Sequence, residues 1–257
     1  MTDLKQLYLE LCMTSVFRRV TEKPLFKAFS EYSKEGIGQD GKIKAYAAFA
    51  EEIYYSGASL TDLVLQLVFE DENVYIKSRA HNLPVSAEVR SAVKRELLVF
   101  EKFAALSTED FKADLGLDYV TPFSSKRVDF SRRYEKRIKG IDRYGYGIFS
   151  SYPMFRLSDD REIEPIKSAD KTSMEKFVGY EKERALVVSN TEAFIEGRPA
   201  LNTLLCGDAG TGKSSTVKAV ANSFFDKGIR LIELRKDQLR FLPYVMGKIS
   251  EIGRAHV

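Results

Sequence analysis

The chain is poor in the residues on which several protein classes depend. Only two of its 257 residues are cysteine, Cys12 and Cys206, too few for a disulfide scaffold or a zinc cluster. Of the two histidines, His81 has no cysteine or acidic residue at the spacing of a metal site. No apolar run approaches the roughly 18 residues that span a bilayer, and the first residues lack a secretory pattern. These absences exclude disulfide-rich secreted and membrane-spanning classes and predict a cytoplasmic protein with no membrane partner.

Neither sign of charge is in excess. There are 40 Lys and Arg residues against 37 Asp and Glu residues, which gives a formal net charge of +3. This balance predicts no general affinity for nucleic acid or for anionic membranes. The hydrophobic share of 44% and the charged share of 30% are typical of globular proteins, and the length suits one or two domains.

Residues 1–117 are predicted to form a mainly helical region. Apolar residues recur at three- and four-residue steps between positions 89 and 104, which indicates one face of a long helix that begins near Ser86. Cys12 lies in an apolar helical stretch and is expected to be buried. Two further helix starts are predicted where a serine precedes an aspartate by three residues: Ser59 with Asp62, and Ser107 with Asp110.

The composition changes over residues 118–173. Aromatic residues become frequent, and glycines interrupt any helical period. The stretch from Gly147 to Ile166, with the turn-prone Ser158–Asp160 in its middle, predicts a β-hairpin. A polar linker at Lys167–Lys171 follows, and we place a domain boundary there.

The same region carries a basic cluster with aromatic residues between its charges. Basic and aromatic side chains together can follow a nucleic-acid backbone and stack on its bases. Acidic residues dilute this cluster, however, and the spacing also suits a solvated helix face. Nucleic acid is therefore the weaker of the two interpretations. The residues concerned are Lys126, Arg127, Arg132, Arg133, Lys136, Arg137 and Lys139, with Phe130, Tyr134 and Tyr144.

Residues 174–250 predict a regular alternation of elements. A helix at Glu181–Glu196 is followed by a short apolar strand at Asn202–Cys206, on which Cys206 is expected to be buried. A glycine-rich loop and a second helix come next, and Ile229–Leu234 reads as another strand. Strand, loop, helix and strand in this order are the opening of a parallel α/β domain.

The loop itself satisfies the pattern G-x-x-x-x-G-K-[ST] of a phosphate-binding P-loop. Its glycines allow the backbone to reach positive φ and to approach phosphate oxygens closely. Successive N–H groups and the helix dipole then attract the anion. Lys213, the candidate catalytic group, is expected to contact the β- and γ-phosphates, and Ser214 to offer its hydroxyl to Mg²⁺. The candidate nucleotide-binding residues are Gly207, Asp208, Ala209, Gly210, Thr211, Gly212, Lys213, Ser214 and Ser215.

The surrounding sequence resembles a known class. The stretches 177–181, 197–200 and 204–215 look like the N-terminal half of an AAA-type ATPase module, and the continuation at 231–239 makes the match closer. The chain is similar to a bacterial family of predicted AAA-type P-loop ATPases of unassigned function. The resemblance implies ATP and Mg²⁺ as cofactors, homo-oligomers in the full-length protein, an unidentified protein partner, and Val178 and Gly179 in the adenine pocket. From the residues alone, these two positions show only an apolar turn before a helix.

Hydrolysis by an AAA-type enzyme also needs an acidic motif at the end of a later strand, and no apolar strand ending in two acidic residues follows Ser214. The resemblance implies that this motif comes shortly after the last residue. Residues 251–257 match what one frame of a common sequencing adapter would encode, and we expect them to be an artefactual tail. A fragment of this kind is expected to be inactive alone and to expose unpaired strand edges.

The sequence thus predicts an α/β fold in which a helical N-terminal region precedes an incomplete P-loop domain. The expected function is ATP binding, with hydrolysis coupled to conformational work in the full-length protein. A nucleotide-regulated module that binds protein or nucleic acid is the first alternative. A P-loop small-molecule kinase is the second.

Overall fold

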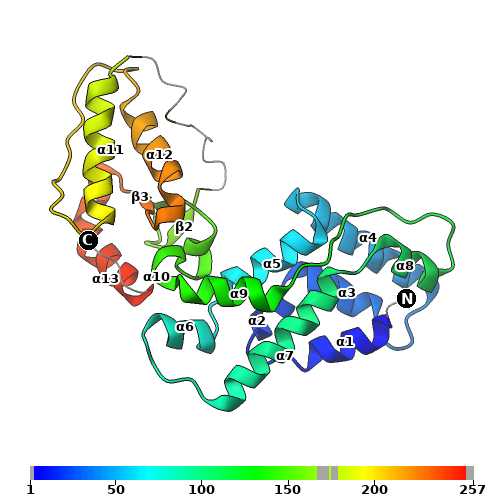
Figure 1. Ribbon diagram of the computed structural model, residues 1–257. Helices are drawn as coiled ribbons and strands as arrows, with labels where there is room; N and C mark the ends of the chain where they lie inside the picture. The colour runs from blue at the N-terminus through cyan, green and yellow to red at the C-terminus, as the bar shows by residue number, and fades with distance from the viewer. Residues whose placement is uncertain (1–2, 167–173, 175–178, 253–257) are drawn as a thin grey trace. The chain divides into compact units, whose positions relative to one another are not determined.

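A computed structural model describes residues 3–166, 174 and 179–252 (Figure 1). The chain divides into two compact units, residues 1–139 and 140–257. The first unit is helical and the second combines helices with a small sheet, which agrees with the predicted fold class. Within the described residues no helix is both long and apolar enough to cross a membrane.

Nine helices build the described part of the first unit. Their starts follow the predicted signals: the Ser59 hydroxyl accepts a hydrogen bond from the Asp62 N–H at 3.1 Å, and Ser86 caps the long helix α7. The helices are α1 (Leu4–Cys12), α2 (Arg18–Thr21), α3 (Pro24–Tyr32), α4 (Gln39–Ser56), α5 (Leu60–Glu70), α6 (Val74–Ala80), α7 (Ala87–Ala104), α8 (Thr108–Leu115) and α9 (Phe130–Lys139).

Aromatic rings fill the centre of this unit. Phe49, Phe103 and Phe111 are completely buried, and Phe29 meets each of them edge-on or tilted at centroid distances between 5.0 and 6.3 Å. Such arrangements favour contact between a ring edge and a ring face, and they add to the gain from burying the large apolar surface. Cys12, by contrast, is exposed at the end of α1, so the prediction that it packs in the core is wrong.

A buried carboxylate holds one turn of this unit in place. Glu96 of α7 is 5% exposed, and its two oxygens accept hydrogen bonds from the backbone N–H groups of Ser15, Val16 and Phe17 and from the Ser15 hydroxyl. The three N–H groups precede α2 and have no other recorded acceptor in the described structure. The Glu96 side chain, in the middle of α7, therefore accepts hydrogen bonds from the N–H groups that precede α2 and would otherwise lack an acceptor.

The second unit contains a three-stranded sheet of order β2-β1-β3. Strand β1 (Met154–Leu157) pairs with β2 (Ile163–Pro165) in an antiparallel manner, and this pair is the predicted hairpin. Strand β3 (Leu231–Glu233) lies parallel to β1 on its other side, with Ile232 opposite Phe155. Parallel neighbours need a long crossover, and here it includes the hairpin turn and both helices around the glycine-rich loop.

The helices of the second unit include the two predicted around the loop. They are α10 (Ile141–Tyr144), α11 (Glu181–Ile195), α12 (Lys213–Ser223) and α13 (Leu242–Ile252), with 3-10 helices η1 (Gly147–Ser150), η3 (Phe225–Lys227) and η4 (Lys236–Phe241). The buried apolar side chains of β1 and of α12 supply most of its core. The start of the hairpin region differs from the prediction, since Gly147–Ser150 is helical.

The predicted strand Asn202–Cys206 is wrong for the structure described. These residues are irregular, no ladder pairs them, and Leu204 is 85% exposed. Cys206 is exposed and not buried. The apolar composition indicated a strand, but both edges of β1 are occupied, by β2 and β3, and this segment pairs with neither of those outer strands.

Candidate functional site

The loop 207–212 adopts the conformation that its glycines permit. Gly207, Gly210 and Gly212 have φ angles of +144°, +83° and +81°, in the region that disfavours a side chain. A Cβ atom at Gly210 would meet nothing within 4 Å, so backbone conformation and not lack of space requires glycine there. Helix α12 begins directly after Gly212, and no side chain caps its first turn, whose N–H groups are therefore candidate donors to an anion.

Lys213 folds back over this loop. Its Nζ donates to the carbonyl oxygens of Gly207 at 2.9 Å and Asp208 at 2.6 Å, and to Thr211 Oγ1 at 3.2 Å. The Thr211 hydroxyl donates in turn to the Asp208 carbonyl at 2.9 Å. An ammonium group is thereby held beside the glycine loop. An anion at this position would be bound by the ammonium group and by the N–H groups of the loop.

The other candidate residues of the loop lie around this centre. Asp208 and Ala209 are exposed in the loop itself. Ser214 is exposed and Ser215 half-buried in the first turn of α12. The described residues hold no group of three or more His, Cys, Asp or Glu side chains suited to a metal ion. Ser214 thus offers a single hydroxyl, which fits Mg²⁺ that arrives on a phosphate chain, because such ions keep waters and phosphates as their other ligands.

The proposed adenine pocket is described only in part, since Val178 lies outside the described residues. Gly179 has a φ of +79°, and its N–H donates to Glu181 Oε1 at 2.8 Å. Hydrogen bonds from the N–H groups of Glu181 itself and of Gly179 hold the pKa of this carboxyl below its usual value. Helices α11 and α12 lie side by side, and their N-terminal ends are at the same end of the pair (Figure 1). Gly179 and the glycine loop therefore lie at one end of this helix pair.

Sequence reasoning missed a residue that positions the segment before the loop. Asn190 of α11 donates to the carbonyl oxygen of Leu201 at 2.7 Å and accepts from the Leu201 N–H at 2.9 Å. Its amide also donates to Thr203 Oγ1 at 3.1 Å. The Asn190 side chain thus bonds both backbone polar groups of Leu201, which a neighbouring strand would do in a sheet. An asparagine in the middle of a helix was the only signal in the sequence.

An ion pair links α12 to the sheet, and part of the helix is buried. Lys218 of α12 forms an ion pair with Glu233 at the end of β3, with 3.7 Å between the charged atoms. Ala219, Val220 and Ala221 are buried on the same helix. The helix that presents Lys213 is therefore supported by packing and not by the loop alone.

The basic cluster of α9 does not present its aromatic residues. Phe130 and Tyr134 are at most 1% exposed and fill the core of the first unit. Lys126 pairs with Asp62 at 2.9 Å. The side chain of Tyr144 lies outside what the structure describes. Stacking of bases on Phe130 or Tyr134 is thus incompatible with this structure, and only the charged face remains of the nucleic-acid interpretation.

The comparisons with known proteins reach only one part of the chain. No curated protein and no solved structure matches it. The model of one protein family matches residues 150–257, which include the glycine loop and the helices on both sides of it. That family is described as a protein of unknown function (DUF815), and this part of the chain is similar to it.

Proposed function

We propose that the protein binds ATP at the loop 207–215 and, in its full-length form, hydrolyses it to drive a conformational change. The observation that carries the proposal is the loop geometry: three glycines at positive φ, an amphipathic helix that begins behind them, and the Lys213 ammonium 2.6 Å from the Asp208 carbonyl. This arrangement concentrates N–H donors and positive charge on one small volume, which suits a triphosphate.

In this proposal each group has one task. The N–H groups of the loop and of the first helical turn bind phosphate oxygens. Lys213 leaves its carbonyl partners and turns to the β- and γ-phosphates, where it offsets their charge. Ser214 contributes a hydroxyl to the Mg²⁺ that the nucleotide carries, and the metal supplies further neutralisation of the phosphate charge. The apolar turn at 178–179 would contact the base, as the resemblance to AAA-type ATPases implies.

Calorimetric titration of the chain with ATP, in the presence and absence of Mg²⁺, tests the binding step. We expect Lys213→Ala to weaken binding about a hundredfold or more, because a desolvated charge-assisted contact is lost. Lys236→Ala, at an exposed position of η4, is the matched control and should bind like the wild type. A wild-type chain that binds no adenine nucleotide would refute the proposal.

In the full-length protein, the fate of bound ATP separates the three functions. Release of phosphate without an added acceptor supports the ATPase. Tight binding without turnover supports a module in which the nucleotide regulates binding of another molecule. Loss of ATP that depends on an added small-molecule acceptor supports a kinase.

A further inference from the structure

Helix α4 has a second face that the first unit does not cover. Its inner face, which includes Phe49 and Ile53, is buried against the bundle. On the outer face Lys44, Ala47, Ala48, Glu51 and Tyr55 are exposed, and Tyr55 has 82% of its surface accessible. These positions recur at three- and four-residue steps, so they form one continuous stripe along the helix.

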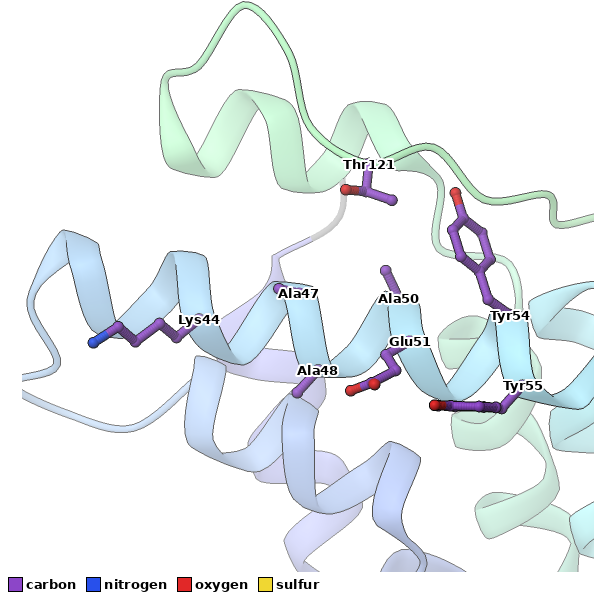
Figure 2. A pocket seen from close by; sticks show the side chains of 8 residues that line it. All are labelled: Lys44, Ala47, Ala48, Ala50, Glu51, Tyr54, Tyr55 and Thr121. Carbon is purple, nitrogen blue, oxygen red and sulfur yellow. The ribbon is translucent and has the colours of Figure 1, made fainter.

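Two hollows lie along this stripe. One, of about 750 Å³, is lined by α4 and by Thr121 of the segment after α8 (Figure 2). The other, of about 610 Å³, lies between α4 and α3 and is lined by Ile37 and Gly41 among others. Lys44, Ala48 and Glu51 line both. The stripe is thus a ridge between two depressions, with two alanines at its centre, a shape on which another helix can pack ridge into groove.

The charges on the stripe have no partner in the described structure. Neither Lys44 nor Glu51 forms an ion pair or hydrogen bond there, although Lys42, on the opposite face of the same helix, pairs with Asp114 at 2.9 Å. Lys44 and Glu51 are two helical turns apart, one near each end of the stripe. The surface therefore has a positive end, a small apolar centre and a negative end.

This pattern is complementary to itself. Lys44 and Glu51 are equally distant in sequence from the midpoint between Ala47 and Ala48. If two α4 helices cross antiparallel at that midpoint, Lys44 of each copy faces Glu51 of the other, and alanines meet at the crossing.

We propose that the outer face of α4 is the interface of a two-fold symmetric dimer of this chain. An interface of this kind is isologous, so each charged pair occurs twice. The central alanines allow the helices to approach closely, and the exposed Tyr55 adds aromatic contact area, which contributes strongly to association. The proposal does not depend on nucleotide binding.

Charge reversal in the full chain tests the arrangement, with the dissociation constant measured by sedimentation equilibrium over a range of concentrations. Glu51→Lys opposes Lys44 with a like charge at both ends, and we expect the constant to rise about tenfold or more. Lys44→Glu should do the same. The double variant with both changes should return to the wild-type constant. Lys94→Glu, on the exposed face of α7, is the control and should change nothing.

Mixing the two single variants gives the sharpest outcome. Each is weakened alone, yet together they restore opposite charges at both ends, so a heterodimer should form. A second test replaces Ala48 with cysteine in a chain whose exposed Cys12 and Cys206 are serine, and oxidation should yield a covalent dimer. Lys94→Cys in the same background should not crosslink.

Several results would overturn the proposal. One is a wild-type chain that stays monomeric at every concentration. Another is a dimer that the single reversals leave intact, or a mixture of the two variants that forms no heterodimer. Because Lys213→Ala should leave the dimer unchanged, failure of this proposal is distinguishable from failure of ATP binding.

Discussion

The Lys213 side chain reaches back across its own loop to the carbonyl oxygen of Asp208, at 2.6 Å. The contact holds the ammonium group close to the position at which it would bind a phosphate. To bind one, the ammonium group must first give up its hydrogen bonds to the carbonyl oxygens. Binding of an anion therefore exchanges neutral carbonyl partners for charged oxygens, which form the stronger hydrogen bonds. The variants below follow from this site and from two buried groups of the helical unit.

The hydroxyl of Thr211 joins Lys213 to the Asp208 carbonyl, and we expect its loss to loosen the loop. Thr211→Val keeps the shape of the side chain and removes one hydrogen-bonded group, which costs about 1 kcal/mol. The dissociation constant for ATP should rise about fivefold in calorimetric titration. Thr211→Ser retains the hydroxyl and is the matched control. Equal affinity of the Val and wild-type chains would contradict this role.

Gly212 caps α12 with a φ of +81°, and a side chain there is expected to weaken nucleotide binding. Gly212→Ala places an alanine in the left-handed region at a cost of about 1–2 kcal/mol, so the loop shifts or α12 begins later. ATP affinity should fall about tenfold. Gly247→Ala is the control, because it lies within α13, where a Cβ would meet nothing within 4 Å. That change should stabilise its helix by about 0.5–1 kcal/mol and leave affinity unchanged.

Glu96 should be among the most sensitive positions of the helical unit. Glu96→Ala leaves three backbone N–H groups before α2 without an acceptor, and we expect the free energy of unfolding to fall by about 3–5 kcal/mol. Glu101 lies on the same helix, and within the described residues its carboxylate accepts one hydrogen bond, from the Phe130 N–H at 2.9 Å. Glu101→Ala should cost about 1 kcal/mol. Urea unfolding measures the free energy of unfolding of both variants. Similar decreases for Glu96→Ala and Glu101→Ala would contradict the role assigned to Glu96.

The buried carboxyl of Asp71 makes the stability of the first unit depend on pH. Burial raises the pKa of Asp71, although the Asn73 amide, which donates to Oδ2 at 2.9 Å, works in the opposite direction. The folded chain therefore holds this proton more tightly than the unfolded chain. The resulting stabilisation is complete below the ordinary pKa of about 4 and is lost as the pH rises through the raised pKa.

Asp71→Asn removes this titration. Relative to the variant, the wild-type free energy of unfolding should decline as the pH rises above about 4, and urea unfolding at a series of pH values measures the difference. Asp118→Asn, at an exposed position after α8, is the control. Parallel pH profiles for wild type and Asp71→Asn would contradict the assignment.

Local signals in the sequence predicted several of the helices correctly. Ser59, Ser86 and Ser107 each precede a helix in the structure, and the capping box at Ser107 is present. Helix Glu181–Ile195 and the hairpin of β1 and β2 lie where the patterns placed them. These features depend on neighbours within four residues or on one tight turn, so the sequence alone contains the information.

The failures concern contacts between distant segments. An apolar run at 202–206 has the composition of a strand, yet a strand needs a partner, and β1 pairs with β3 instead. Phe130 and Tyr134 fit a base-stacking surface as well as a core, until helix packing buries them. Asn190 could not be recognised, because its acceptor and donor at Leu201 lie eleven residues away.

By itself the sequence determined the glycine loop, the lysine behind it and the start of α12, because backbone freedom at Gly207, Gly210 and Gly212 is a property of the residue type. Only the tertiary structure decided which strands pair, which aromatic rings are buried, and that α4 keeps an uncovered outer face. Those outcomes depend on which apolar surfaces pack against one another in the core. A pattern of neighbouring residues does not contain this information, because the packing involves segments that are distant in sequence.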